Sequence, residues 1–246
     1  MSVRNVIRLL ALPLLFAAQT LWADSEQTTT IDDSIAWEVV HTGDDIGEIS
    51  TWRRAIPGAD VKQFRGEVTI RQPALHVLLS IDNPADLKKW VYFCRDSKGI
   101  PPEYSYMEYK GVWPVASRYV TLKSKSWIDN GVIYINSRNL DNVGPEPKNM
   151  VKIREFNNLF EITPLEENLT RIRFTTFVDL GGKLPSWLAN AVSSRAPGVT
   201  LSGLRDLLDE GEWDYSNATV NDLSSVAQNK EGLQALLDEV AARTSN

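Results

Sequence analysis

An alternating segment followed by a helical one constrains the fold of this chain more than any other feature. Along residues 171–178, mostly apolar side chains alternate with polar ones, Ile172, Phe174, Thr176 and Val178 against Arg171, Arg173 and Thr175. A period of two is typical of a strand with one dry and one wet face. The segment Pro185–Leu208 follows shortly afterwards and is long enough to cover the dry face as a helix. We therefore expect a sheet packed against one long, late helix.

The segment Pro185–Leu208 repeats apolar residues near helical spacing, at Leu188, Val192, Val199, Leu204 and Leu208. Such spacing gives a helix an apolar stripe that can face a sheet. Pro197-Gly198 lies inside the segment, and a proline removes one hydrogen bond of the helix. The helix is therefore predicted to kink at this pair.

The first half of the chain also carries patterns of strands and helices. Three short segments between Trp37 and Ile70 are rich in Val, Ile, Trp and Phe, and Pro57-Gly58 provides a turn between two of them. Helices are predicted over Pro73–Ser80 and Pro84–Phe93, because proline is well placed in a first helical turn. Further on, Val120 and Leu122 face one way and Thr121, Lys123 and Lys125 the other. This alternation predicts another strand with one wet face.

The first residues have the pattern of an export signal. Arg4 and Arg8 precede a short apolar run, Leu9–Ala18, and Leu21-Trp22-Ala23 offers a cleavage site. A membrane anchor is the alternative, but the run is much shorter than the roughly 20 apolar residues that span a bilayer. We therefore expect residues 1–23 to be a signal peptide and the mature protein to be periplasmic.

The charge balance and the single cysteine narrow the class of protein. The chain has 32 acidic residues against 26 basic ones, a formal net charge of −6, and no block of Lys or Arg. It therefore lacks the basic footprint on which nucleic-acid binding depends. Cys94 is the only cysteine, so no intramolecular disulfide can form. This fits export to a bacterial periplasm better than secretion from a eukaryotic cell.

Three segments carry motifs that occur together in one known family. Gly111–Arg118 is similar to a Trp-Pro-Val-Ser-Asp-Arg-Asp entry into a central strand, and Pro145–Arg154 is similar to a proline-rich loop that leads into a Val-Arg strand. Asp179–Asn190 resembles the pattern Asp-x-Gly-Gly-x-x-Pro-x-Trp-Leu-x-Asn that opens a last helix. In this order, the three motifs resemble the StAR-related lipid-transfer (START) family, over most of residues 35–210.

The resemblance implies an α+β helix-grip fold, in which a curved antiparallel sheet wraps around a long C-terminal helix. The fold would enclose a tunnel for one sterol, phospholipid or other hydrophobic ligand, and the loop Asn139–Asn149 would form part of its gate. Residues 24–210 would make up this domain. Residues 211–246 would add an acidic stretch and a short amphipathic helix, predicted at Leu223–Ala242.

Two departures from the family pattern bear on the ligand. Ser117 and Tyr119 stand where acidic residues are common in the family. Lys123 and Lys125 stand where a further arginine that helps to bind polar headgroups would be sought. The identity of the headgroup is therefore not carried over from the resemblance.

The candidate ligand-binding residues come from the strands and from the late helix. Apolar wall residues are expected on the strand, at Ile172, Phe174 and Val178, and on the helix, at Leu188 and Val192. Each could equally fill an ordinary core. Glu108 and Arg118 are candidates for polar groups in or beside the cavity. Trp113 and Trp187 are expected to shape the ends of the tunnel.

Enzyme signatures are missing from the sequence. Its two histidines, His41 and His76, form no His-x-His or Glu-x-x-His pattern, and paired cysteines are absent, so no metal site is predicted. Gly-x-Ser-x-Gly and phosphate-binding glycine loops are absent too, and no cofactor is predicted.

Three functions remain open at this stage. The first is non-catalytic binding, with transfer, of a lipid or other hydrophobic molecule by a monomer that contacts a membrane transiently. The second is a cyclase-like or hydrolase-like enzyme that works inside the cavity, with Glu108 beside Arg118 as acid or base. The third is an interaction module with a closed cavity, whose segment 212–246 docks a partner. Ligand in the purified protein separates the first from the third, and turnover of that ligand identifies the second.

Overall fold

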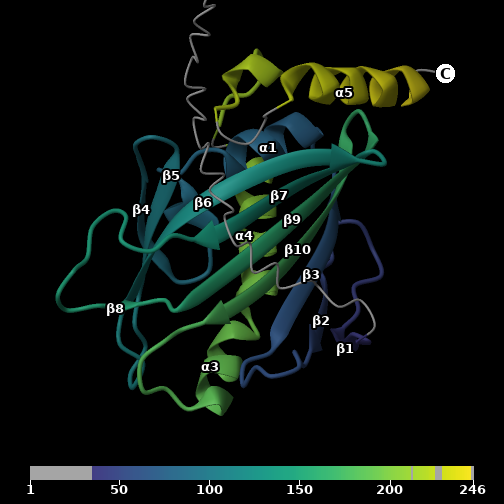
Figure 1. The fold of residues 1–246 in the computed structure, drawn as a ribbon. Helices are drawn as coiled ribbons and strands as arrows, with labels where there is room; N and C mark the ends of the chain where they lie inside the picture. The colour runs from purple at the N-terminus through teal and green to yellow at the C-terminus, as the bar shows by residue number, and fades with distance from the viewer. Residues whose placement is uncertain (1–34, 212, 225–228, 245–246) are drawn as a thin grey trace, which may run out of the picture. The chain divides into compact units, whose positions relative to one another are not determined.

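The computed structural model describes residues 35–211, 213–224 and 229–244, which belong to one compact unit. The predicted signal peptide, residues 1–23, lies outside the described residues. Within these residues, a large antiparallel sheet and late helices confirm the predicted α+β class and the helix-grip arrangement (Figure 1).

Ten strands of the described chain form one sheet. Their order in the sheet is β1-β2-β3-β10-β9-β7-β6-β5-β4, and the short β8 pairs parallel with β6 while the other pairs are antiparallel. The strands are β1 (Glu38–His41), β2 (Ser50–Arg54), β3 (Gln63–Ile70), β4 (Cys94–Ile100), β5 (Tyr104–Tyr109), β6 (Arg118–Asp129), β7 (Val132–Asn139), β8 (Val151–Lys152), β9 (Glu155–Glu166) and β10 (Leu169–Asp179).

The helices lie at both ends of the sheet and across one of its faces (Figure 1). They are α1 (Ala74–Ile81), α2 (Leu87–Trp90), α3 (Ser186–Ser193), α4 (Ala196–Asp209), the short η1 (Val220–Asp222) and α5 (Lys230–Thr244). Figure 1 shows α4 behind β7, β9 and β10, and α4 contacts β3, β10 and α2. None of the helices in the described ranges has the length and apolar character of a membrane span.

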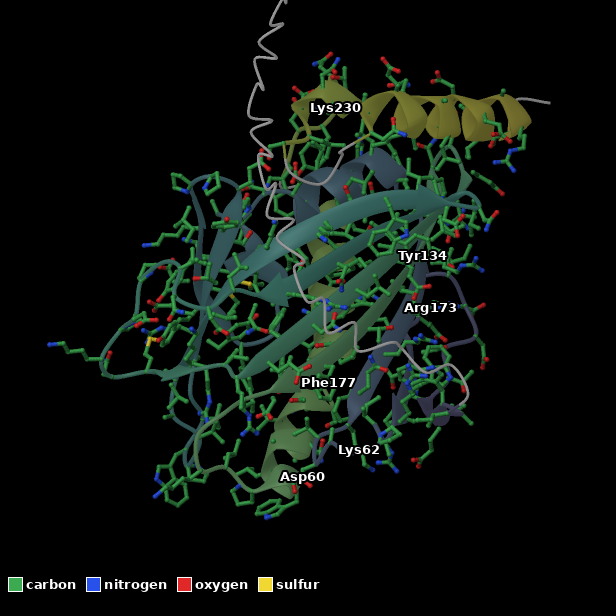
Figure 2. The ribbon with its side chains drawn as sticks, viewed as in Figure 1. Asp60, Lys62, Tyr134, Arg173, Phe177 and Lys230 are labelled. Atoms are coloured by element: carbon green, nitrogen blue, oxygen red, sulfur yellow. The ribbon has the colours of Figure 1, made fainter. Side chains whose placement is uncertain are left out.

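The predicted alternation on β10 is confirmed. Ile172 and Phe174 are buried in the core that α4 covers. Arg173, labelled in Figure 2, instead forms ion pairs with Glu67 and Glu161, its neighbours on β3 and β9. One face of the sheet is therefore dry and the other charged at this strand, as a period of two requires.

The late helix is broken before the predicted kink. The segment divides into α3, which ends at Ser193, and α4, which begins at Ala196, so that Pro197 lies in the first turn of α4. A proline in a first turn breaks no hydrogen bond, since the amide there has no partner within the helix. Because α4 starts a new helical phase, Val199 is 39% exposed, contrary to the predicted stripe, and Leu201 is buried instead.

The predicted wet face of β6 is covered at its first half. Thr121 is buried because the connection after β7 folds over it: its hydroxyl donates to the carbonyl of Val143 at 2.7 Å. The amide of Leu140 in turn donates to the carbonyl of Thr121 at 2.8 Å. Lys123 and Lys125, further along β6, are exposed as predicted.

The C-terminal segment packs on the domain. The indole Nε1 of Trp213 donates to a carboxylate oxygen of Asp86 at 2.9 Å, and Leu223 is buried. α5 begins at Lys230, later than the helix predicted from Leu223, and places Leu233 and Val240 in buried positions beside β9. The apolar stripe of this helix therefore covers the far end of the sheet.

Candidate ligand-binding cavity

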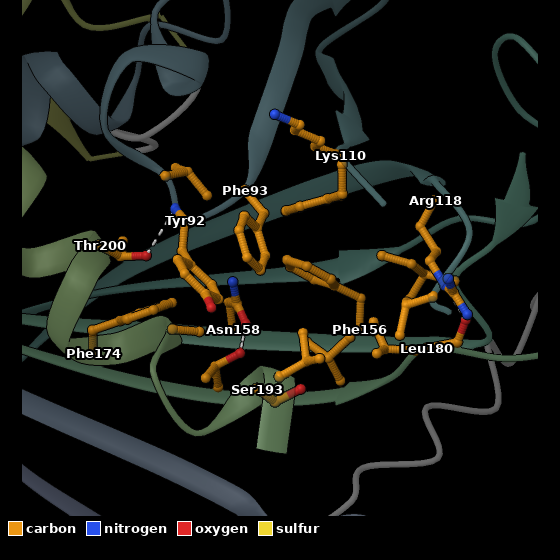
Figure 3. A pocket seen from close by; sticks show the side chains of 18 of the residues that line it. Tyr92, Phe93, Lys110, Arg118, Phe156, Asn158, Phe174, Leu180, Ser193 and Thr200 are labelled. Atoms are coloured by element: carbon orange, nitrogen blue, oxygen red, sulfur yellow. Dashed lines mark hydrogen bonds between the residues drawn. The ribbon is translucent and has the colours of Figure 1, made fainter. Parts of the chain in front are cut away.

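A cavity of about 90 Å³ lies between the inner face of the sheet and the junction of α3 with α4 (Figure 3). We call it the outer compartment. Its walls come from residues 91–93 before β4, from the β5–β6 connection, and from β9, β10, α3 and α4. Because these segments are far apart in the sequence, only the complete fold brings them together.

The register of β9 and β10 builds the apolar wall of this compartment. Phe174 lies opposite Phe160, and Val178 lies opposite Phe156. Directly paired residues of antiparallel strands project from the same face. The rings of Phe160 and Phe174 stack with their centroids 4.4 Å apart. Phe156, Phe174 and Val178 then face the outer compartment together.

A second cavity, of about 60 Å³, adjoins the first, and we call it the inner compartment. The residues that line both compartments form a partition between them: Val91, Tyr109, Phe156, Asn158, Phe174 and Thr200. Three of these six side chains are aromatic. The two compartments therefore adjoin each other and share part of their wall.

Hydrogen bonds fix two polar members of the partition. The hydroxyl of Thr176 donates to Asn158 Oδ1 at 2.5 Å, and the amide of Tyr92 donates to Thr200 Oγ1 at 3.2 Å (Figure 3). These polar atoms have partners within the protein, so they add little polarity to the cavity wall.

The inner compartment combines apolar walls with a few hydroxyls. Met107, Leu122 and Ile135 line it, together with Ser124 and Ser137. The hydroxyls of those two serines are 2.8 Å apart and hydrogen-bond to each other. The inner compartment is therefore mildly polar at the serines, and the buried carboxylate of Asp82, which accepts a hydrogen bond from the Ser224 hydroxyl at 3.1 Å, lines it as well.

The indole of Trp90 also lines the inner compartment. Its Nε1 is buried and has no hydrogen-bond partner among the described residues. A buried N–H without an acceptor costs the folded protein free energy.

Arg118 is the charged group of the outer compartment that the structure buries most deeply. It starts β6, is 5% exposed, and lines the cavity. Its Nε donates to the carbonyl of Leu180 at 3.5 Å, and its Nη1 donates to the carbonyl of Ala116. Burial lowers the pKa of this guanidinium. No Asp or Glu of the described chain lines the outer compartment.

The phenols at the cavity are neutral at physiological pH. Burial raises the pKa of Tyr109 well above its ordinary value, and it also raises the pKa of Tyr92, against the opposing effect of Arg195. A raised pKa means that the phenol keeps its proton to higher pH. These rings can therefore donate hydrogen bonds but supply no negative charge.

Glu108 does not accompany Arg118. In the ladder between β5 and β6, Glu108 lies opposite Tyr119, whereas Arg118 lies opposite Tyr109. Because neighbouring residues of a strand project from opposite faces, Glu108 and Arg118 point away from each other. The Glu108 carboxylate instead accepts hydrogen bonds from Arg95 at 2.7 Å and from the Tyr106 hydroxyl at 3.0 Å. The acid-and-base pair considered from the sequence is not formed.

The other candidate residues fall into two groups. Phe174, Val178 and Val192 line the outer compartment, as does Arg118. Ile172 is buried in the core and Leu188 is half-buried, and neither lines the outer or the inner compartment.

The two tryptophans expected at the tunnel ends are outside the cavity. Trp113 is 93% exposed and Trp187 is 70% exposed. Each nevertheless belongs to a segment that reaches the cavity. Val115 and Ala116 of the β5–β6 connection line the outer compartment, and so do Val192 and Ser193 of α3.

The loop Asn139–Asn149, expected to be part of the gate, contributes no lining residue to either compartment. It packs instead over β6, through Val143 on Thr121, and Asp141 forms an ion pair with Lys152 at 2.9 Å. The segments that border the outer compartment are residues 91–93, the β5–β6 connection, and the α3–α4 junction.

Sequence reasoning missed Tyr92, Phe93, Tyr109, Phe156 and Asn158 as cavity residues. For the pair on β9 a signal existed, because Phe156, Asn158, Phe160 and Ile162 alternate with a period of two. No sequence pattern predicts that Phe93 faces the cavity. Its backbone adopts a positive φ of 55° in a tight connection, which follows neither strand nor helix periodicity.

Fold and cavity together define a class of domain, and comparison with solved structures identifies it. The chain has the fold of StAR-related lipid-transfer domains. A StAR-related lipid transfer protein from Xanthomonas axonopodis superposes with a TM-score of 0.63 and 23% sequence identity, over 70% of this chain and 98% of the other. Human STARD10 superposes with a TM-score of 0.62 and 17% identity, over 83% of each chain.

Comparison of sequences adds one relative. A protein of Pseudomonas aeruginosa is 22% identical over 167 residues, which are 66% of this chain and 83% of the relative. No protein-family model matches the chain. At these levels of identity the comparisons establish the fold and leave the ligand to be argued from the cavity.

Proposed function

We propose that this protein binds a hydrophobic molecule in its cavity and carries it through the periplasm, without chemistry of its own. The observation that carries the proposal is the largely apolar cavity between sheet and helices, walled by Phe156, Phe174 and Val178. Ligand sites of this kind are concave and mostly apolar, with few polar groups for orientation. The START fold supports the proposal, since its solved examples include StAR-related lipid transfer proteins from Xanthomonas axonopodis and human.

The physical task of such a protein is to keep an apolar chain out of water. A chain of about sixteen carbons resists leaving a membrane by roughly 12 kcal/mol, at about 0.8 kcal/mol for each methylene group. A dry cavity offsets this cost without forming a bond. The protein then needs only a shape that excludes water and a way for the ligand to enter.

Entry requires the cavity to widen. The compartments of about 90 Å³ and 60 Å³ are each smaller than the roughly 300–1,000 Å³ of sites that hold drug-sized ligands. The partition can yield by rotation of Tyr109, Phe156 and Phe174. The outer border can yield at α3, where Ala189 is the one residue buried among those the structure describes in this helix.

Membrane contact is part of the proposal. Trp113 and Val112 are exposed on the β5–β6 connection, and Trp187 is exposed on α3, both of which border the cavity. An exposed indole joins an apolar ring to a polar N–H, which suits the interface between lipid and water. These side chains would bring the border of the cavity to the membrane from which the ligand is taken.

The test is to purify the mature chain without detergent and to compare its mass under native and denaturing conditions, followed by organic extraction. The proposal predicts an apolar species of defined mass at about one per protein, released unchanged. A protein that is empty and takes up no fluorescent fatty acid, sterol or phospholipid would overturn it. Release of a chemically altered product after incubation with the extracted species would instead identify an enzyme.

A further inference from the structure

Arg118 is a buried cation without a counter-ion. Its two contacts are the carbonyls of Leu180 and Ala116, which are neutral, and no carboxylate of the described residues pairs with it. A guanidinium has five N–H donors, and these contacts use Nε and one N–H of Nη1. The remaining donors, on Nη1 and Nη2, have no acceptor in the described chain.

Two acids near Arg118 form hydrogen bonds with other arginines. Asp179, at the end of β10, accepts a hydrogen bond from Arg154 Nε at 2.8 Å, and Glu108 accepts one from Arg95. Among the described residues, no carboxylate lines the outer compartment beside Arg118. The acid of the cavity wall is Asp82 in the inner compartment, and it accepts a hydrogen bond from the Ser224 hydroxyl at 3.1 Å.

A second cation borders the same compartment. The side chain of Lys110 lines the outer compartment, and Figure 3 shows its ammonium group directed away from the rings of Phe93 and Phe156. A lysine in this position covers apolar surface with its methylene groups while its charge stays in water. Lys110 can thus attract an anion to the border, whereas Arg118 can hold it inside.

A buried, unpaired charge is costly, and an anion placed against it recovers that cost. The planar guanidinium matches a carboxylate or a phosphate, each of which can accept two parallel hydrogen bonds. Beyond Arg118 the wall is apolar, at Phe156, Val178 and Leu180. The arrangement is one fixed, buried cation in the wall of the outer compartment, which adjoins a second compartment.

We infer that the ligand is a single-chain amphiphile whose anionic head, a carboxylate or a phosphate, binds Arg118 and whose apolar chain passes the aromatic partition into the inner compartment. The inference rests on the proposed function and adds the class of ligand. One chain is favoured over two because the two adjoining compartments are small, at about 90 Å³ and 60 Å³.

The experiment measures the affinity of the mature protein for three probes with the same sixteen-carbon chain: the fatty acid, the fatty alcohol, and the alkyl phosphate. We expect the fatty acid or the alkyl phosphate to bind at least tenfold more tightly than the fatty alcohol. Whichever of the two anions binds more tightly shows whether the head group of the ligand is a carboxylate or a phosphate. Equal affinities of all three probes would overturn this inference and leave the proposed function standing. No binding of any probe would count against both.

Two variants locate the effect. Arg118→Gln is expected to remove the preference for anions while its affinity for the alcohol changes by less than about threefold. Lys123→Gln, which removes an equal charge from the exposed half of β6, is the matched control and is expected to keep the preference. A preference that survives in Arg118→Gln would overturn the assignment to this side chain. If Arg118→Gln does not fold, the inference is still tested by the ratio of the affinities for fatty acid and fatty alcohol, measured in the unaltered protein and in Arg118→Lys.

Discussion

The two helices that follow β10 are held in different ways. α4 buries Thr200, Leu201, Leu204 and Leu208 against the sheet and α2, whereas Ala189 is the buried residue of α3. Both helices border the outer compartment, through Val192 and Ser193 on one side and Ala196 and Thr200 on the other. The difference indicates that α4 is a firmly packed wall of the cavity and that α3 is a weakly anchored one. Four predictions test this comparison, from the largest expected effect to the smallest.

The largest effect is expected from removing a leucine of α4. Leu204 is fully buried, so Leu204→Ala should lower the free energy of unfolding by about 3 kcal/mol, within the range of buried leucine truncations. The matched change on α3, Leu188→Ala, removes the same atoms from a half-buried site and should cost about 1 kcal/mol. Urea denaturation of both variants measures the contrast. Equal losses would break the distinction between the two helices.

A glycine pair within α4 gives the next effect. A Cβ added at Gly203 would lie 2.8 Å from the carbonyl oxygen of Trp90, so Gly203→Ala should force α4 away from α2 and cost about 1–2 kcal/mol. At Gly198 the nearest atom would be a methyl of Thr51 at 3.7 Å. Gly198→Ala should therefore be neutral or stabilising by up to about 1 kcal/mol, because alanine favours a helix. Thermal unfolding compares the two, and a loss at Gly198 as large as at Gly203 would show that α4 is not anchored by this close approach.

Much of this fold could be predicted from the sequence, because its signals are local. The alternation around Ile172 and Phe174, and the motif from Asp179 to Asn190, each depend on neighbours in the chain. The pairing of Glu108 was not accessible, since it depends on the register between β5 and β6. A shift of one residue would have placed it on the other face.

The division of the late helix and the place of the loop after β7 show the same limit. Pro197 predicted an interruption, but whether a proline kinks a helix or begins a new one depends on the chain before it. The loop Asn139–Asn149 was assigned to the gate by resemblance, whereas its contact with Thr121 is tertiary. Phe174, Val178 and Val192 line the cavity as expected, because a strand or helix pattern fixed the direction in which each side chain faces.

Hydrogen exchange sharpens the comparison without a mutation. Amides of α3 are expected to exchange at least tenfold faster than those of α4, because few buried contacts hold α3 in place. A bound ligand should slow exchange in α3 more than in α4, since it packs against Val192. Identical protection of the two helices, with and without ligand, would contradict a movable wall.

The smallest effect on stability is expected at the exposed indoles. Trp113→Ser combined with Trp187→Ser should change the free energy of unfolding by less than about 0.5 kcal/mol for each exposed site. The same variant should bind phospholipid vesicles several-fold more weakly in a sedimentation assay. Trp127→Ser is the control, because Trp127 is exposed nine residues along β6 from Arg118, a distance of about 30 Å at strand spacing. Equal vesicle binding by the double variant and the control would remove membrane contact from the proposal.

The central claim, that the cavity holds an apolar ligand, is tested most directly by filling it. Val192→Trp places a large ring in the outer compartment, and Ala191→Trp places the same ring on the exposed side of α3. Each variant is purified without detergent, and its extracted ligand is weighed against folded protein by mass spectrometry. The account predicts that Val192→Trp loses the ligand and that Ala191→Trp keeps it. If both variants retain an equal amount of ligand, the cavity is not the binding site.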